Sequence, residues 1–177
     1  MKPLITLFFF VVASIMPAHA DTLTIAMVGD IMMGTTFPSE MLPANNGDDL
    51  FNDAKPLLLE ADLTVGNLEG TLCDSGKSTK GTGKNSYAFR TPTSYAHHLK
   101  DAGFDFLSMA NNHANDFGLE GIESTERCLK EQDILYAGIE GRVESAVIEC
   151  KGNVLTVIFN TVGTKKLAKD LAPLKKL

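Results

Sequence analysis

The chain has 177 residues, with 22 acidic and 16 basic side chains and a net charge of −6. Residues 1–20 carry a lysine, a short apolar run and an Ala-His-Ala ending, which predicts a cleaved signal peptide, with an uncleaved membrane anchor as the alternative. Removing Lys2 leaves the rest more acidic, which disfavours a nucleic-acid partner. We therefore expect an exported protein, periplasmic or extracellular, whose remaining residues suffice for one domain.

The first predicted elements are two strands with a helix between them. A near-continuous apolar run over 22–29 is typical of a parallel strand that is buried on both faces. A helical pattern follows over 48–61, although Pro56 leaves its start uncertain, and a second apolar strand ends at Asn67.

The segment 73–86 is rich in Gly, Ser, Thr and Lys and is the one long loop of the sequence. Its glycines lack the order of a nucleotide-phosphate loop, so that function is not expected. A flap over a site and a solvated loop both remain open.

A second helix is predicted over 91–103. Thr91 is a candidate cap, Pro92 suits the first helical position and Gly103 suits the residue just past the end. Tyr95, Leu99 and Ala102 would then share one buried face.

The third strand ends near Asn111, and a third helix is predicted over 119–132 from the spacing of Leu119, Ile122 and Leu129. Three short strands are expected after it. This alternation of strands and helices predicts an α/β fold with a mainly parallel sheet.

The chain has three cysteines, Cys73, Cys128 and Cys150, which is an odd number for a protein predicted to be exported. At most one disulfide can form within a molecule. The spacing matches no zinc-binding pattern, so buried or loosely paired thiols are expected.

Polar side chains follow each of the three strands: Asp30, then Asn67 and Glu69, then Asn111, Asn112 and His113. Ligands of parallel sheets gather at the carboxyl ends of strands. Oxygen donors with an imidazole suit a divalent metal such as Mn, Fe, Zn or Mg. Taken singly, each residue could instead serve as a cap, a turn residue, a solvated carboxylate or a packed histidine.

Four stretches, "MVGDIMMG", "ADLTVGNLEG", "YAFRTP" and "GFDFLSMANNHANDFGLEGIEST", resemble successive motifs of the CapA family of poly-gamma-glutamate capsule biosynthesis proteins. The resemblance covers roughly residues 23–148. It implies the fold of the calcineurin-like metallophosphoesterases, a layered α/β sandwich, of which this chain would hold the N-terminal half.

The resemblance also implies roles for single residues. In the wider superfamily an asparagine like Asn112 binds metal, and a histidine like His113 contacts the scissile group as an acid. Asp30 would be a metal ligand, and Glu69 with Asn67 would lie where the superfamily has its bridging carboxylate.

Three further residues have alternative interpretations. Asp116 is expected either to orient His113 by a hydrogen bond or to cap a helix. Arg90 is expected to contact an anionic substrate or to be simply exposed. His97 and His98 lie within a helix and on no motif, so they are treated as structural or surface residues.

Full-length relatives carry later strands with a Gly-x-His-x-His motif, whereas this chain has no histidine past His113. We therefore expect a C-terminally incomplete domain over 21–160 and a basic tail over 161–177. Three functions stay open: a metal-assisted hydrolase or transferase of capsule synthesis or anchoring, a non-catalytic factor that binds the polymer or a membrane synthase, and an inactive remnant.

Overall fold

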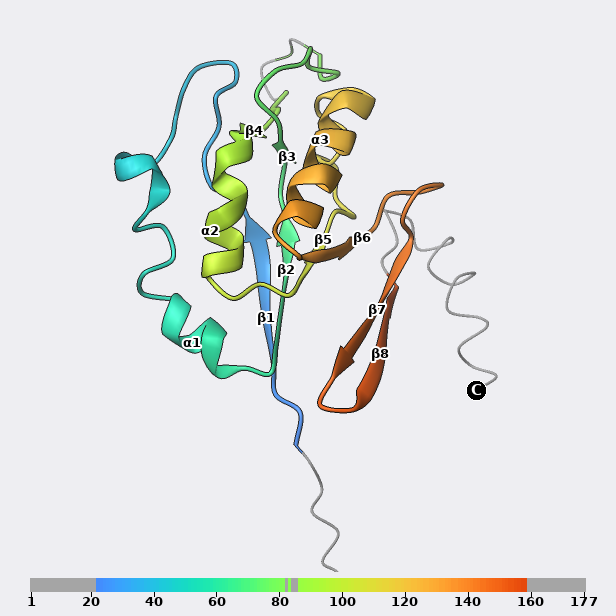
Figure 1. Ribbon diagram of the computed structural model, residues 1–177. Helices are drawn as coiled ribbons and strands as arrows, with labels where there is room; N and C mark the ends of the chain where they lie inside the picture. Colours follow the sequence, from blue (N-terminus) through green and yellow to red (C-terminus); the bar gives the residue numbers. More distant parts are fainter. Residues whose placement is uncertain (1–21, 82, 84–85, 159–177) are drawn as a thin grey trace, which may run out of the picture.

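A computed structural model describes residues 22–81, 83 and 86–158. Its centre is a four-stranded parallel sheet in the order β1-β2-β5-β6 (Figure 1). These strands are β1 (Ile25–Ile31), β2 (Leu63–Leu68), β5 (Phe106–Ser108) and β6 (Leu135–Ala137). The predicted parallel α/β sheet is confirmed, while the predicted signal peptide and basic tail lie outside the described residues.

The helices that connect these strands pack on one face of the sheet. They are α1 (Lys55–Glu60), α2 (Ala96–Asp101) and α3 (Gly118–Glu131), with short 3-10 turns η1 (Ala44–Gly47) and η2 (Thr93–Tyr95). Leu58, Leu99 and Leu129 from the three helices belong to one core with Leu107 of the sheet. Burial of this apolar surface is the main force that holds the helical layer in place.

An antiparallel hairpin of β7 (Ser145–Cys150) and β8 (Asn153–Ile158) packs on the other face (Figure 1). Ile148 of β7 forms a second core with Leu63, Val65 and Phe106. Successive residues of a strand point to opposite faces, so Leu63 and Val65 face the hairpin while Leu68 faces the helices. A short parallel pair, β3 (Thr71–Leu72) and β4 (Arg90–Thr91), lies apart from the main sheet.

The first strand is displaced from its prediction and is less buried than expected. It begins at Ile25 and continues through Asp30 to Ile31. Met27 is 78% exposed and Ile25 is 43% exposed. The reason is that β1 is an outer strand of this sheet, and the second core reaches only β2, β5 and β6.

The first two helix predictions are correct in place but too long. Residues before Lys55 form turns, and Pro56 lies in the first turn of α1, where no intrahelical N–H bond is lost. The second helix divides into η2 and α2, and Gly103 follows it with φ +93°. Thr91 does not cap it: Thr91 belongs to β4, and its hydroxyl donates to the Gly34 carbonyl at 2.8 Å.

The third helix is confirmed, with Ile122 and Leu129 buried. Leu119 is 57% exposed, contrary to the prediction, because it lies in the first turn of α3 on the rim of a surface cavity.

All three cysteines are free thiols. Burial raises the pKa of Cys73 and of Cys128, which disfavours their reactive thiolate forms. Within the described residues, no helix is long and apolar enough to span a bilayer.

Candidate functional site

The carboxyl ends of β1 and β2 bring two carboxylates to one asparagine. The pairing of these strands is irregular between Met27 and Asp30, and Asp30 then pairs with Asn67. The Asn67 amide nitrogen donates to Asp30 Oδ1 at 2.8 Å and to Glu69 Oε2 at 3.2 Å. The structure thus joins three of the residues that the sequence predicts as metal ligands.

Asn111 connects the end of β5 to this group. Its amide nitrogen donates to Asn67 Oδ1 at 3.0 Å and to the Leu68 carbonyl at 2.8 Å, while its side-chain oxygen accepts from the His113 amide at 2.9 Å. Sequence reasoning placed Asn111 at this edge of the sheet but gave it no role of its own, because the resemblance favours the second asparagine of the pair. The only signal was the double asparagine itself.

Asn112 is exposed. Its main-chain oxygen accepts a hydrogen bond from Lys80 Nζ at 2.8 Å. The structure therefore places its backbone at the site, and its assignment as a metal ligand stays a prediction.

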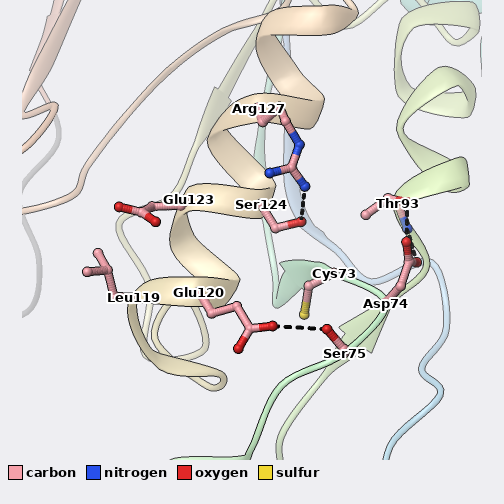
Figure 2. A pocket seen from close by; sticks show the side chains of 9 residues that line it. All are labelled: Cys73, Asp74, Ser75, Thr93, Leu119, Glu120, Glu123, Ser124 and Arg127. Carbon is pink, nitrogen blue, oxygen red and sulfur yellow. Dashed lines mark hydrogen bonds between the residues drawn. The ribbon is translucent and has the colours of Figure 1, made fainter.

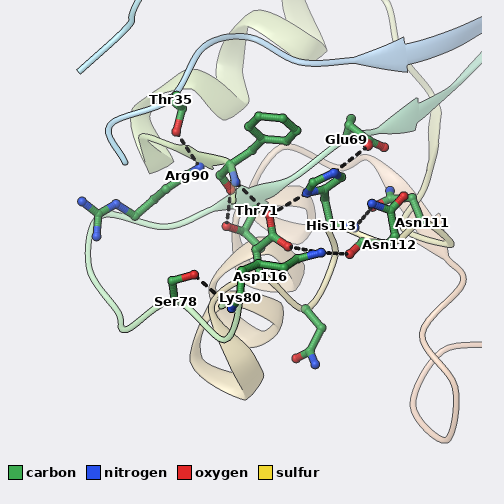
Figure 3. Close-up of polar contacts among 12 residues, drawn as sticks. Thr35, Glu69, Thr71, Ser78, Lys80, Arg90, Asn111, Asn112, His113 and Asp116 are labelled. Atoms are coloured by element: carbon green, nitrogen blue, oxygen red, sulfur yellow. Dashed lines mark hydrogen bonds and ion pairs between the residues drawn. The ribbon is translucent and has the colours of Figure 1, made fainter. Parts of the chain in front are cut away.

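His113 lies between two carboxylates (Figure 3). Its Nδ1 is 2.8 Å from Asp116 Oδ2, and its Nε2 is 3.5 Å from Glu69 Oε1. The Phe89 ring packs against the imidazole with centroids 4.4 Å apart. These contacts fix the plane of the imidazole and leave 12% of the side chain exposed.

Asp116 is fully buried and accepts two hydrogen bonds through Oδ2, from His113 and from the Phe89 amide, both at 2.8 Å. Its Oδ1 accepts no hydrogen bond but lies 3.2 Å from Lys80 Nζ, an ion pair by distance alone. The cap of α3 is at Phe117 and has no side-chain hydrogen bond. Of the two interpretations of Asp116, the hydrogen bond to His113 is the one present.

Part of the long loop packs on the site. The Thr79 amide donates to the Asp116 carbonyl at 2.8 Å, and its hydroxyl donates to the Asn115 carbonyl at 2.7 Å. Lys80 follows, and it lines a cavity of 540 Å³ together with Tyr87 and His113. Neither Thr79 nor Lys80 was predicted at the site, since both depend on how the loop folds back.

The turn after β5 is held from behind by the end of β6. Gly138 has φ +113°, and a Cβ there would lie 2.6 Å from the Ala110 amide nitrogen and 2.7 Å from the Ala110 Cβ. Only glycine permits both this conformation and this approach. The segment that carries Asn111 and His113 is therefore supported directly by the sheet.

Arg90 is directed away from His113 in Figure 3. Its Nε donates to Thr36 Oγ1 at 2.9 Å, and its guanidinium lies 5.7 Å from the Phe37 ring and 5.4 Å from the Phe117 ring. The structure does not bring Arg90 into contact with the predicted ligands, and its role with substrate stays a prediction.

Figure 2 shows a separate cavity of 390 Å³ beside the first turns of α3. Its polar groups bind one another. The Ser75 hydroxyl donates to the Glu120 carboxylate at 2.9 Å, and the Thr93 hydroxyl donates to the Asp74 carboxylate at 2.6 Å. None of the strand-end residues lines this cavity, so we place the candidate chemistry elsewhere.

Comparison with known proteins identifies the family of the chain. The family described as bacterial capsule synthesis protein PGA_cap matches residues 24–175. The chain belongs to this family. The match extends past Ile148, where the motif resemblance ends, and into the predicted tail. The predicted metallophosphoesterase-like α/β fold is confirmed.

Three curated relatives show the same similarity. "Capsule biosynthesis protein CapA" of Bacillus anthracis is 35% identical over 129 residues, which is 72% of this chain and 31% of that protein. "PGA biosynthesis protein CapA" of Bacillus subtilis (strain 168) is 32% identical over 120 residues, 67% and 31% of the two chains. An uncharacterized protein of Sinorhizobium fredii is 34% identical over 130 residues, 71% and 27%. This PGA_cap member thus spans about a third of the curated relatives that it matches.

The strand ends of this PGA_cap member carry oxygen donors of the kind that bind divalent cations. Asp30 and Glu69 share one neutral donor, the Asn67 amide nitrogen, so their oxygens keep capacity for another positively charged partner. Carboxylate oxygens beside an imidazole are ligands of Mg, Mn, Fe or Zn, whereas the Asn67 oxygen already accepts a hydrogen bond from Asn111.

A second group that could hold a metal ion lies elsewhere in the described chain. Asp48, His97 and His98 each offer one ligand atom, and these atoms all lie within 4.8 Å of one another. Sequence reasoning treated both histidines as structural or surface residues, because Asp48 is distant in sequence and no motif links the three.

Proposed function

We propose that this chain is an exported protein that acts in the synthesis or anchoring of poly-gamma-glutamate, through a metal-dependent hydrolase or transferase site at the strand ends. The observation that carries the proposal is the continuous series of polar contacts from Asp30 through Asn67 and Glu69 to His113. The CapA names of the Bacillus relatives support the choice of polymer. The secretory pattern of residues 1–20 supports export.

Asp30, Asn67, Glu69 and Asn112 are the residues that would hold the ion. When bound, a divalent ion polarises a phosphoryl or acyl oxygen and lowers the pKa of water, which makes a nucleophile available near neutral pH. Mn, Fe, Zn and Mg all suit these ligands.

His113 is the proposed proton donor. A carboxylate oxygen accepts hydrogen bonds, so Asp116 Oδ2 holds the proton of His113 on Nδ1. The other ring nitrogen, Nε2, then carries a lone pair, so it takes a proton from water and gives that proton to a leaving group. Asp116 is a positioning residue, and the Phe89 amide and Lys80 keep its carboxylate in place.

A binding function without chemistry is the second candidate, with the polymer or its membrane synthase as the partner. The observation in its favour is a pair of cations on well-held segments: Lys80 contacts Asn112 and Asp116 at the site, and Arg90, although directed away from His113, is fixed by Thr36 and two aromatic rings. Such groups suit a polymer that carries a carboxylate on every residue.

The test is incubation of the purified chain with poly-gamma-glutamate and Mn²⁺, with polymer length followed by size-exclusion chromatography and light scattering. The enzyme proposal expects shortening that needs the ion and is lost in Asp30→Ala and His113→Ala. Asp49→Asn is the control, since that carboxylate faces Asn45 and Asn52 instead. Retention of the polymer without shortening would favour the binding function, and neither effect would contradict both.

A further inference from the structure

The loop 44–48 and the start of α2 form a compact polar pocket apart from the strand-end site. It is a cavity of 100 Å³, and Asp48, His97, His98, Asp101 and Lys55 are among its lining residues. That volume holds an ion and a few waters, since a water takes about 30 Å³.

The hydrogen bonds of the two histidines determine which ring nitrogens are free. His97 Nδ1 is 2.5 Å from the Ser94 carbonyl, and His98 Nε2 is 2.8 Å from the Asn46 carbonyl. A carbonyl only accepts, so each of these nitrogens carries the proton of the neutral ring. The lone pairs are therefore on His97 Nε2 and His98 Nδ1. Histidines that bind metal commonly donate their other N–H in this way.

The backbone of the loop lies against the His98 ring and has an unusual conformation. Asn45, Asn46 and Gly47 have φ values of 52°, 53° and 84°, three left-handed residues in succession. A Cβ on Gly47 would lie 3.2 Å from His98 Nε2 and 3.2 Å from the Tyr95 ring. A left-handed backbone costs conformational free energy, and it persists only where the surrounding structure stabilises it. It places the Asn46 carbonyl on His98 and carries Asp48 to the same pocket.

Both rings are held in place. His98 is 6% exposed, with Tyr95 edge-on to it at 5.2 Å, and His97 packs on His98 with ring centroids 3.9 Å apart. With neutral imidazoles, Asp48, Asp101 and Lys55 leave one net negative charge in the pocket, which favours a cation.

We propose that Asp48, His97 and His98 form a second metal site, specific for a borderline divalent ion such as Zn²⁺. Two imidazoles and one carboxylate are ligands of catalytic zinc sites, in which a fourth position stays open to water or a partner group. One ligand atom from each residue already lies within 4.8 Å of the other two. Ligand atoms of tetrahedral zinc lie about 3.3 Å apart, so the three atoms must move closer together when an ion binds. The oxygen-rich strand ends suit harder ions.

The test is calorimetric titration of the full chain with Zn²⁺ in excess Mg²⁺, supported by the visible absorption of bound Co²⁺. We expect a Zn²⁺ site whose affinity falls at least about tenfold in Asp48→Asn and in His97→Ala. Both residues are exposed, so the variants should fold, as circular dichroism would check. Asp49→Asn is the matched control, because it removes a neighbouring carboxylate that lies outside the group, and it should bind as the wild type does.

The Asp30→Ala, His113→Ala double variant separates this site from the proposed active site. Retention of Zn²⁺ there supports a second site, whatever the activity. Unchanged binding in His97→Ala, loss of all Zn²⁺ in the double variant, or no binding by the wild type would each overturn the proposal.

Discussion

At the scale of single residues, Asp116 is the side chain on which the candidate site depends most. It is fully buried, and one carboxylate binds His113, faces Lys80 and accepts from a main-chain amide. Asparagine in its place keeps the volume but loses the charge that holds the proton on His113 Nδ1.

We expect Asp116→Asn to lower kcat far more than KM in any reaction of the site, because the substitution disturbs proton transfer rather than binding. Asp116→Ala should in addition cost about 1–3 kcal/mol of unfolding free energy, since the buried Phe89 amide loses its acceptor. Steady-state kinetics and urea unfolding check the two effects. Equal losses of kcat in Asp116→Asn and in Asp49→Asn would contradict the positioning role.

The thiols give a second prediction at this scale. Burial raises the pKa of Cys73 and Cys128, while Cys150 is half-buried. In the folded protein a thiol reagent should therefore modify Cys150 first and the other two only on unfolding. Mass spectrometry of the labelled peptides measures this order. Rapid labelling of Cys73 would show that its thiol is accessible in the folded protein and would contradict the prediction.

At the scale of elements, Asp62 connects the start of β2 to the segment before β1 and to the turn of the β7–β8 hairpin. Its carboxylate accepts from the Thr24 amide at 2.9 Å and lies 2.6 Å from Lys151 Nζ, in the turn of the hairpin. The hydrogen bond from Lys151, followed by those from Thr24, lowers the pKa of Asp62 from 3.8 to about 2.

Because this pKa is lowered by folding, Asp62 contributes to stability above about pH 4, and the contribution is lost as the pH falls toward about 2. Unfolding free energy should decrease over that range in the wild type and less steeply in Asp62→Asn. Urea titrations at a series of pH values would measure both slopes, and parallel slopes would contradict the linkage.

The close contact between β6 and the turn after β5 is a second test of an element. Gly138→Ala should destabilise the fold by about 1–3 kcal/mol, because the new Cβ meets Ala110 and the residue has φ +113°. Gly141→Ala is a matched control: it also has positive φ, +72°, but nothing lies within 4 Å of its Cβ. An equal loss in both variants would show that the contact with Ala110 is unimportant.

Helices and strands were predicted correctly where the apolar pattern is local in the sequence. The apolar run of β2 and the spacing of Ile122 and Leu129 in α3 predicted those elements correctly. Thr91 was assigned wrongly as a cap because its partner, the Gly34 carbonyl, is distant in sequence. The exposure of Met27 likewise depends on a distant segment, because the hairpin covers β2, β5 and β6 but not β1, and no local pattern reveals this.

The candidate site was predictable to a similar extent. Asp30, Asn67, Glu69 and His113 follow from strand ends and motif resemblance, and the structure joins them. Asn111 was placed at the edge without a role, and Lys80 and the group of Asp48, His97 and His98 were missed. Their roles arise from contacts between distant segments: Lys80 from a loop that folds back, and Asp48 from a turn with left-handed residues.

At the scale of the whole molecule, the chain is a PGA_cap member with one parallel sheet, a helical layer on one face and a hairpin on the other. Its strand ends carry mainly oxygen donors, whereas the second group, Asp48, His97 and His98, contains two imidazoles.

The central claim is that the strand ends bind a divalent metal, and the most direct measurement is Mn²⁺ binding by the purified chain, followed by electron paramagnetic resonance of the free ion. We predict stoichiometric binding by the wild type, loss of that binding in the Asp30→Ala, His113→Ala double variant, and retention in His97→Ala. No binding by the wild type, or undiminished binding by the double variant, would contradict a metal-dependent site at the strand ends.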